Sequence, residues 1–339
     1  MSVDSITIRL LNKDEYYLWD IFVNECKYGT IFNSTFWLKN LLNYKNIQFK
    51  ILAVFDANKE IVAGFAFGQK NKFGVFKIVV PTPYTPYNGI LIKEKKSKYQ
   101  SKIESFNFKI LNYINKFLLS NYKYISISFS PDYNDIRPFS WNNYNTKILY
   151  TYRLKLENLS NIFDNFDSDI KRRIKKAKQL SYEIKVENNQ HSIKTFYQLQ
   201  NLSFEKQKHQ FNLSEEEFIN FMQGIFKKNA ARIYTIYTDD SVPVASCVVL
   251  LSNNTAYYWL AGSNPNFLNT GFNQLLFWEM LNDLSENKIE RFDFMGANTN
   301  SIARYKSTYN FTLTPYYSAT IVNGFIPKIL FSVKNILND

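Results

Sequence analysis

The order of predicted secondary structure is the feature that most restricts how this chain can fold. Hydrophobic periodicity and capping residues predict two helices, a strand hairpin, a long helix and a strand in the first half. The second half repeats that order, with three strands in place of the hairpin. No identical residues recur at a fixed period, so the repetition is structural. We expect two mixed-sheet α/β domains with helices on both faces, 1–156 and 157–339, divided near Leu156 to Asp167.

The predicted elements follow from local signals. Asn12 with Glu15, and Ser214 with Glu217, have the spacing of a capping box, which indicates a helix start. The turn DANKE separates two apolar runs, as in a β-hairpin, and the proline-rich PTPYTPYNG predicts an ordered loop. Helices are expected over 12–26, 34–44, 99–119, 169–180, 192–208, 214–228 and 272–287, and strands beginning at 47, 61, 76, 89, 124, 147, 231, 243, 255, 291 and 312.

Composition and charge narrow the class of partner. Apolar residues make up 45% of the chain, which is enough for a substantial core. The formal net charge is +12, from 41 lysines and arginines against 29 acids. Such an excess favours polyanionic partners, which are nucleic acid, nucleotide phosphates or an anionic membrane surface. Frequent Asn, Lys, Ile, Tyr and Phe are typical of an AT-rich coding genome of the bacterial kind, which accounts for part of the lysine content.

Several classes of site are not expected from the sequence. Cys26 and Cys247 are far apart, and His191 and His209 lack flanking Cys or Asp, so we expect neither a disulfide framework nor a metal. None of the 10 glycines fits GxGxxG or a P-loop, which disfavours those nucleotide-binding folds. No signal peptide or apolar span is visible, so the sequence predicts a cytoplasmic protein.

The segment AGSNPNFLNTGFNQLLFWEML is the best candidate for an anion site. A strand ends near Gly262, and Thr270 and Gly271 precede an apolar helix that includes Asn273. Thr270 is a capping candidate, and Gly271 would let a ligand approach the free amides of the first turn. A pyrophosphate would fit there. The alternative is an ordinary capped helix with no ligand.

The run IKRRIKKAKQL places six cations between Lys171 and Lys178. Its apolar residues fall on one helical face, so the cations cover the rest. The functional interpretation is a phosphate-binding helix, with Arg172, Arg173 and Lys176 as the ligand residues. The alternative is a solvated helix face.

The stretch FDFMGANTNSIARYKSTYN joins an apolar strand to a loop and a cationic patch. Strand alternation places Asp293 on the face opposite Phe292 and Phe294. Asp293 is then either a structural acid bonded to nearby backbone or a residue that positions an amine nucleophile. Arg304 and Lys306 are either surface charges or the cations that stabilise an oxyanion or a phosphate.

These segments together carry a resemblance. RFDFMGANTNSIARYKSTYN, DIKRRIKKAKQLSYEI and NTGFNQLLFWEML are similar to segments of FemABX-type and related GNAT-superfamily acyltransferases, and they occur in the same order. The resemblance implies two tandem GNAT-like domains, with the donor site in the second. It also implies transfer of an acyl or aminoacyl group from a thioester or a tRNA ester to an amine. The pair Tyr305 and Lys306 would then lie near the donor carbonyl, where Lys306 would offset negative charge.

The sequence departs from the tRNA-using relatives at one point. Those relatives often carry a helical coiled-coil insertion, and the roughly 85 residues between Glu205 and Glu290 leave no room for it beside the predicted elements. The departure favours acyl-CoA, with acetyl-CoA first, over aminoacyl-tRNA. Glu205 is a candidate general base, and a solvated helix position is its alternative. Cys247 is expected to be a buried, inert thiol.

Three functions therefore remain open on the sequence. The first is an acyl-CoA-dependent N-acyltransferase for a small-molecule amine, an amino sugar or a cell-envelope precursor. The second is an aminoacyl-tRNA-dependent FemABX-type transferase that acts on cell-wall peptide, with tRNA as its partner. The third is a non-catalytic module that binds anions or nucleic acid through the basic helix. The acceptor, the general base and the oligomeric state are left open.

Overall fold

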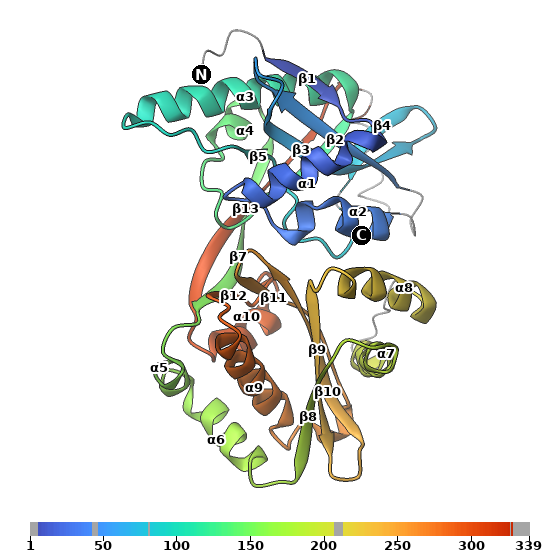
Figure 1. Cartoon of the computed structure of the whole chain (residues 1–339), viewed down its shortest axis with the longest axis vertical. Coiled ribbons are helices and arrows are strands. Elements are labelled where there is room, and N and C mark those ends of the chain that lie inside the picture. The colour runs from blue at the N-terminus through green and yellow to red at the C-terminus, as the bar shows by residue number, and fades with distance from the viewer. Residues whose placement is uncertain (1–5, 43–46, 81, 207–212, 326, 328–339) are drawn as a thin grey trace. The chain divides into compact units, whose positions relative to one another are not determined.

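The computed structural model describes residues 6–42, 47–80, 82–206, 213–325 and 327. The chain divides into two compact units (Figure 1). Unit 1 comprises Met1–Leu149 and Pro315–Asp339, and unit 2 comprises Tyr150–Thr314. Each unit combines helices with strands of a mixed sheet, so the expected mixed α/β class is confirmed.

The sheet of unit 1 is mostly antiparallel. Neighbouring strands are antiparallel except for β4 and β6, which pair in parallel at Ile78 and Tyr124. The short strand β5 pairs with β3. The strands, in sheet order, are β1 (Thr7–Leu10), β2 (Gln48–Phe55), β3 (Ile61–Lys72), β4 (Phe76–Val80), β6 (Tyr124–Ser128) and β13 (Thr312–Val322), with β5 at Leu91–Ile92.

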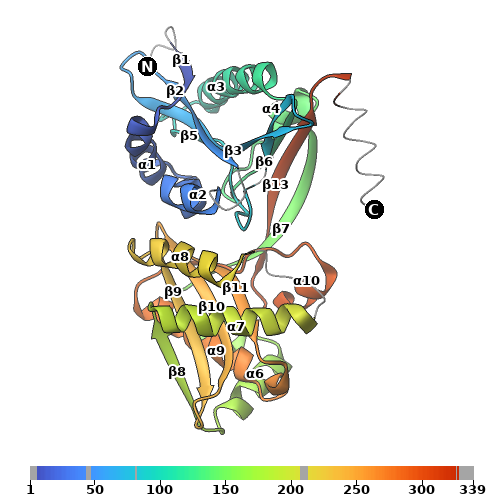
Figure 2. The ribbon, with the colours of Figure 1, turned by 90° about the vertical axis from the view of Figure 1, so that its right-hand side faces the viewer.

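Helices cover both faces of the unit 1 sheet. One face packs on the apolar side of α3, where Ile110, Ile114 and Leu118 are fully buried against β2 and β3 side chains such as Phe65 and Phe67. The other face is covered by α1 and α2 (Figure 2). The helices of this unit are α1 (Tyr16–Glu25), α2 (Thr35–Leu42), α3 (Gln100–Asn121) and α4 (Arg137–Trp141), with 3-10 turns at Lys13–Glu15 and Ile31–Asn33.

The sheet of unit 2 has the same character. Its neighbouring strands are antiparallel except for β11 and β12, which are parallel. The strands, in sheet order, are β7 (Asn145–Lys155), β12 (Arg291–Asp293), β11 (Thr255–Ser263), β10 (Pro243–Ser252), β9 (Ala231–Thr238) and β8 (Tyr182–Glu187).

Helices also cover both faces of the unit 2 sheet. Helices α6 and α9 pack together in an aromatic-rich core on one face, and α7 and α8 cover the other (Figure 2). The helices are α5 (Leu159–Asp164), α6 (Ser168–Ala177), α7 (Gln190–Lys206), α8 (Glu215–Phe226), α9 (Phe272–Glu286) and α10 (Asn300–Ser307), with a 3-10 turn at Pro265–Phe267.

The structural division differs from the expected domains 1–156 and 157–339 in two places. Strand β7 contains the first division, at Leu149 and Tyr150, and the end of the chain returns to unit 1. It returns because β13 pairs with β6 over five residue pairs, from Ser318 with Ser128 to Val322 with Tyr124. Local sequence patterns predicted the strand at 312 but not its distant partner. The secondary structure also differs from the expectation at α10, where the sequence suggested only a loop and a cationic patch.

Candidate functional site

The sheet of unit 2 opens where β11 and β12 part. Their parallel pairing covers three residue pairs and stops at Tyr257 and Asp293, while β11 continues to Ser263. After Asp293 the backbone turns away through Met295 and Gly296, both in the left-handed region with φ of +52° and +49°. The first three residues of β11 therefore have β12 as a neighbour, and the rest of the strand on that edge does not.

A cavity of about 200 Å³ lies at this opening. It is built by four elements: β10 supplies Ser246, β11 supplies Tyr258, α9 supplies Asn273 and α10 supplies Lys306. The remaining lining residues are Ala245, Ala261, Gly262, Ser263, Leu276, Phe294 and Tyr305. The wall is mainly neutral, and Lys306 is the charged residue among those that line it.

Lys306 closes the turn that follows β12. Its Nζ donates hydrogen bonds to the carbonyl oxygens of Phe294 at 2.6 Å and Gly296 at 3.0 Å, and to that of Met295. The ammonium also lies 4.7 Å from the centroid of the Phe294 ring. Burial lowers the pKa of Lys306 to about 8, and the nearby charge of Asp293 acts in the opposite direction. Lys306 thus places a cation at the cavity and fixes the turn that forms part of its wall.

Asp293 is fully buried and lies beneath this turn, outside the cavity lining. Its Oδ1 accepts hydrogen bonds from the Thr151 hydroxyl at 2.6 Å and the Met295 amide at 2.9 Å. Its Oδ2 accepts from Arg153 Nε at 3.1 Å. These contacts fit the structural acid, which was one of the two roles that the sequence left open.

Gly271 is the N-cap of α9, with φ of +90°. A Cβ at this position would lie 2.3 Å from the carbonyl oxygen of Arg173 in α6. A Cβ at Gly262 would similarly lie 2.4 Å from the backbone nitrogen of Gln200 in α7. Both glycines therefore allow helices to pack closely, whereas the sequence suggested that Gly271 leaves room for a ligand. Thr270 supports the turn, because its hydroxyl donates to Phe267 O at 2.7 Å and accepts from Phe272 N at 3.3 Å.

The basic helix α6 lies against the start of α9 but does not line the cavity. Its predicted apolar face is buried. Arg172 and Arg173 both pair with Asp169 at 2.5 and 2.7 Å. Lys176 Nζ donates to Asn269 O at 3.2 Å, in the loop before α9. Arg172 and Lys176 line a separate shallow depression of about 570 Å³.

Two other candidate residues lie away from the cavity. Arg304 is exposed on α10, and Glu205 is exposed near the end of α7, so neither is among the lining residues. His209 falls outside the described residues, and His191 is exposed at the start of α7. Within the described part of the chain, no cluster of three or more His, Cys, Asp or Glu side chains could hold a metal.

Sequence reasoning missed two polar residues of the opening, Ser246 and Tyr258. Ser246 lies within a buried apolar strand, and its hydroxyl is 2.8 Å from that of Thr235. Tyr258 has a buried hydroxyl whose pKa burial raises. The lone serine in an apolar run was a usable signal, but aromatics are too frequent here for Tyr258 to stand out. Tyr305 is noticeable because cations flank it in the sequence, and its hydroxyl lies 2.9 Å from that of the buried Tyr309, whose pKa burial raises.

Comparison with known proteins shows which fold this arrangement belongs to. Residues 164–307, all within unit 2, match the family model of the acetyltransferase (GNAT) domain. The structure is similar to that of FemX, with 12% identity and a TM-score of 0.67 over 91% of this chain and 96% of FemX. The chain has a FemABX-like GNAT-superfamily fold. The resemblance inferred from its motifs is confirmed, as is the tandem GNAT-like fold class.

Two further solved structures share this GNAT-superfamily fold. L-PGS from Bacillus licheniformis has 13% identity and a TM-score of 0.58, over 96% of each chain. A tandem GNAT protein from the clavulanic acid biosynthesis pathway has 9% identity and a TM-score of 0.53, over 95% of this chain and 99% of that chain. At such identities the likeness concerns the fold. No curated protein matches the sequence.

Cysteine chemistry has no support at this site. Cys247 is buried in β10, and burial raises its pKa, so the thiol stays protonated and unreactive at neutral pH. Burial also raises the pKa of Cys26 in unit 1. No described helix is long and apolar enough to span a membrane.

Proposed function

We propose that the chain is an N-acyltransferase that moves an acyl group from acyl-CoA, acetyl-CoA first, to an amine. The acceptor would be a small molecule, an amino sugar or a cell-envelope precursor, and the reaction would take place in the cytoplasm. The single observation that carries the proposal is the opening between β11 and β12, with a small cavity and the cation of Lys306 beside it. The GNAT-superfamily fold supports acyl or aminoacyl transfer in general.

The opening suits an extended thioester donor. Beyond Tyr257 the pairing of β11 with β12 ends, and this edge of β11 would receive a pantetheine chain in the way that a sheet receives an added strand. The cavity, lined by neutral side chains such as Ser246 and Leu276, would take the acyl group. The start of α9, at Thr270, Gly271 and Asn273, would hold the pyrophosphate through its backbone amides and the positive end of the helix dipole, on the side of Gly271 that the Arg173 carbonyl does not occupy.

The reaction requires few catalytic groups from this chain. A neutral amine attacks the thioester carbonyl, a C–N bond forms, the C–S bond breaks, and the amine proton passes to solvent or thiolate. The site must align the two reactants and stabilise the tetrahedral oxyanion. Lys306 already gives its hydrogen bonds to three carbonyls, so we assign it an electrostatic role through its charge and through the turn that it holds. Asp293 acts only by positioning that turn.

Unit 2 is the better donor site because unit 1 fills the equivalent opening. In unit 1 the parallel pair is β4 with β6, and the loop after β4 crosses the place where those strands part. Asn88 of this loop forms a β-bridge with Ser128, and the Ser128 hydroxyl donates to Pro86 O at 2.6 Å. The proline-rich loop predicted from the sequence therefore occupies in unit 1 the position that the cavity has in unit 2.

The aminoacyl-tRNA-dependent function is the second candidate. The likeness to FemX favours it, and so do the exposed cations of α6, where the Arg172 side chain is 78% exposed. In this alternative Arg172, Arg173 and Lys176 would contact tRNA phosphates. The described helices between Glu205 and Glu290 are α8 and α9, and the longer of them has 15 residues. That length favours acyl-CoA, because it leaves no coiled coil for tRNA.

A thermal-shift and transfer experiment separates these candidates. Acetyl-CoA at a hundred times its Kd should add roughly 2.7 kcal/mol to the free energy of unfolding. Ala261→Trp should abolish this shift, because Ala261 is an exposed residue on the cavity wall whose enlargement blocks the opening. Ala261→Ser, of nearly the same size, should retain it.

The outcomes of this experiment are distinct. Acetyl transfer to an amine acceptor would support the first candidate. If CoA species give no shift while charged tRNA binds and loses its aminoacyl group to an acceptor, the second candidate replaces it. Binding of nucleic acid with no turnover of either donor would instead support a non-catalytic module.

A further inference from the structure

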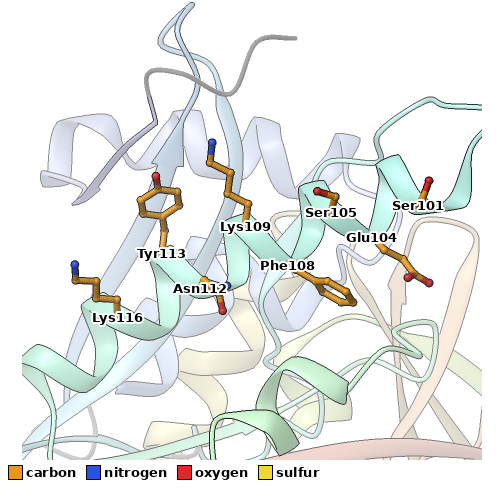
Figure 3. Close-up of a pocket in the computed structure, with 8 residues that line it drawn as sticks. All are labelled: Ser101, Glu104, Ser105, Phe108, Lys109, Asn112, Tyr113 and Lys116. Atoms are coloured by element: carbon orange, nitrogen blue, oxygen red, sulfur yellow. The ribbon is translucent and has the colours of Figure 1, made fainter.

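The outer face of α3 in unit 1 is a second surface with a distinct chemistry (Figure 3). We define the α3 face by Phe108, Lys109, Tyr113 and Lys116 of α3, together with Arg137 and Trp141 of α4. The α3 members line a broad, shallow depression of about 590 Å³. The opposite side of α3 is fully buried at Ile110 and Ile114, so the helix stays fixed on its domain.

Aromatic side chains on this face are unusually exposed. Trp141 is 62% exposed and Tyr113 is 38% exposed. Trp141 packs edge-on against Phe108, with ring centroids 5.3 Å apart, and so extends the aromatic surface beyond α3. Exposed apolar side chains that form one patch with a polar rim mark an interaction surface, whereas single exposed ones do not.

The charges on the α3 face are mainly positive. Lys109 and Lys116 flank Tyr113 along the helix, and Lys102 lies one to two turns before Lys109. Two acids, Glu104 and Asp135, both pair with Arg137, at 3.0 and 2.8 Å, so the lysines outnumber the remaining charges. The face therefore presents net positive charge with aromatic rings between the cations, which complements a surface that is negatively charged and partly apolar.

We propose that the α3 face docks the protein on an anionic lipid bilayer. Tyr and Trp rings prefer the headgroup region, where their apolar bodies and polar edges are both accommodated. Lysine side chains bury their methylenes and keep their ammonium groups among anionic headgroups. Docking of this kind is peripheral, because no described helix could span a membrane. It does not depend on the acyl donor or on the site in unit 2.

The arrangement of the rings favours a bilayer over RNA. The guanidinium of Arg137 lies 5.3 Å from the centroid of Phe108 and 5.8 Å from that of Trp141. A cation over both rings competes with base stacking, which needs an open ring face. Insertion among headgroups needs only exposed ring edge and area, which Trp141 and Tyr113 provide.

Tryptophan fluorescence of the full chain tests the proposal. The other four tryptophans, Trp19, Trp37, Trp259 and Trp278, are at most 8% exposed, so Trp141 dominates the response to solvent. Phosphatidylcholine vesicles containing phosphatidylglycerol should shift the emission to the blue and protect it from iodide. Phosphatidylcholine vesicles alone should not. Trp141→Leu should remove the shift.

Sedimentation with the same vesicles tests the charges. Lys109→Ala combined with Lys116→Ala should lower the partition coefficient about 25-fold, or about fivefold for each lysine beside an anionic leaflet. Lys227→Ala combined with Lys228→Ala is the matched control, because it removes two exposed cations from unit 2 and should leave strong binding.

Three results would overturn the proposal. The first is absence of binding to the anionic vesicles. The second is equal loss of binding in the α3 pair and in the control pair, which would mean that general charge is responsible. The third is a Trp141 response to tRNA that the α3 pair abolishes, with no response to vesicles, which would identify RNA as the partner.

Discussion

Arg153 donates from Nε to the fully buried carboxylate of Asp293 at 3.1 Å, from β7 to the neighbouring strand β12. The same carboxylate accepts the amide of Met295, and Lys306 binds the carbonyl of Gly296 one residue later. The turn after β12 is thus held by an anion on its amide side and a cation on its carbonyl side. This pairing fixes the wall of the cavity.

Removing the charge of Asp293 alone from its ion pair with Arg153 should lower the free energy of unfolding strongly. Asp293→Asn removes the negative charge with which the partly buried Arg153 guanidinium pairs, and should lower the free energy of unfolding by about 3 kcal/mol. Arg153→Met in the same chain should recover part of that loss. Urea denaturation of the four members of the double-mutant cycle measures the coupling. Glu94→Gln, at the exposed pair with Lys27, is the control and should cost less than about 0.5 kcal/mol. Equal costs at the two sites would contradict the structural role of Asp293.

Lys306→Met should affect both activity and stability. Methionine fills similar space but cannot bind three carbonyls, so we expect a loss of roughly 1–3 kcal/mol in unfolding free energy. The transfer rate should fall roughly ten- to a thousand-fold if the charge stabilises the oxyanion. Arg304→Met, on the exposed side of α10, should change neither by much. A Lys306→Met variant with normal kcat would show that the lysine is only structural.

The stability contribution of Lys306 should depend on pH in a defined window. Its folded pKa is about 8, below the ordinary 10.5. Between these values the folded chain has released the proton that the unfolded chain still holds, so the unfolding free energy rises with pH. The difference in unfolding free energy between the wild type and Lys306→Met should therefore grow from pH 8 to 10.5. A difference that stays flat or shrinks over that range would contradict the lowered pKa.

Substitution by alanine should lower the free energy of unfolding more at Gly271 than at Gly296. Gly271→Ala combines a φ of +90° with a collision against Arg173 O, and should cost more than about 2 kcal/mol without any ligand. Gly296→Ala keeps a φ of +49° and meets open space, so its cost should be about 1 kcal/mol. Thermal denaturation of the free protein measures both. If Gly271→Ala keeps its Tm and loses only CoA binding, the glycine serves the ligand as the sequence suggested.

Local chemistry made much of the fold predictable. The capping box of Ser214 and Glu217 forms as expected, with reciprocal bonds of 3.2 and 2.8 Å. The Asn12 and Glu15 box also forms, although it opens a 3-10 turn before α1. Ile170, Ile174 and Ala177 lie on the buried face of α6 because a 3.6-residue period sets that face. Such signals need only neighbours within one or two turns.

Tertiary contacts made the rest unpredictable. The three carbonyls that Lys306 binds are 10 to 12 residues away, and only the placement of α10 brings them together. The sequence pointed to Thr270 as the cap, one residue before the actual N-cap Gly271, and the α6 backbone that occupies the space beside Gly271 comes from a helix about a hundred residues earlier. The return of β13 to β6 spans nearly two hundred residues, which no local pattern encodes.

The return of β13 has a consequence for synthesis on the ribosome. Unit 2 is one continuous segment, whereas unit 1 also needs residues 315–322 of β13, which emerge after the whole of unit 2. Until then β6 lacks β13, and an unpaired strand edge is a template for wrong association. Unit 2 can therefore finish folding before the last strand of unit 1 has been synthesised. A nascent chain released before residue 315 would therefore carry the complete cavity of unit 2 and an incomplete sheet in unit 1, and truncation should cause aggregation through unit 1.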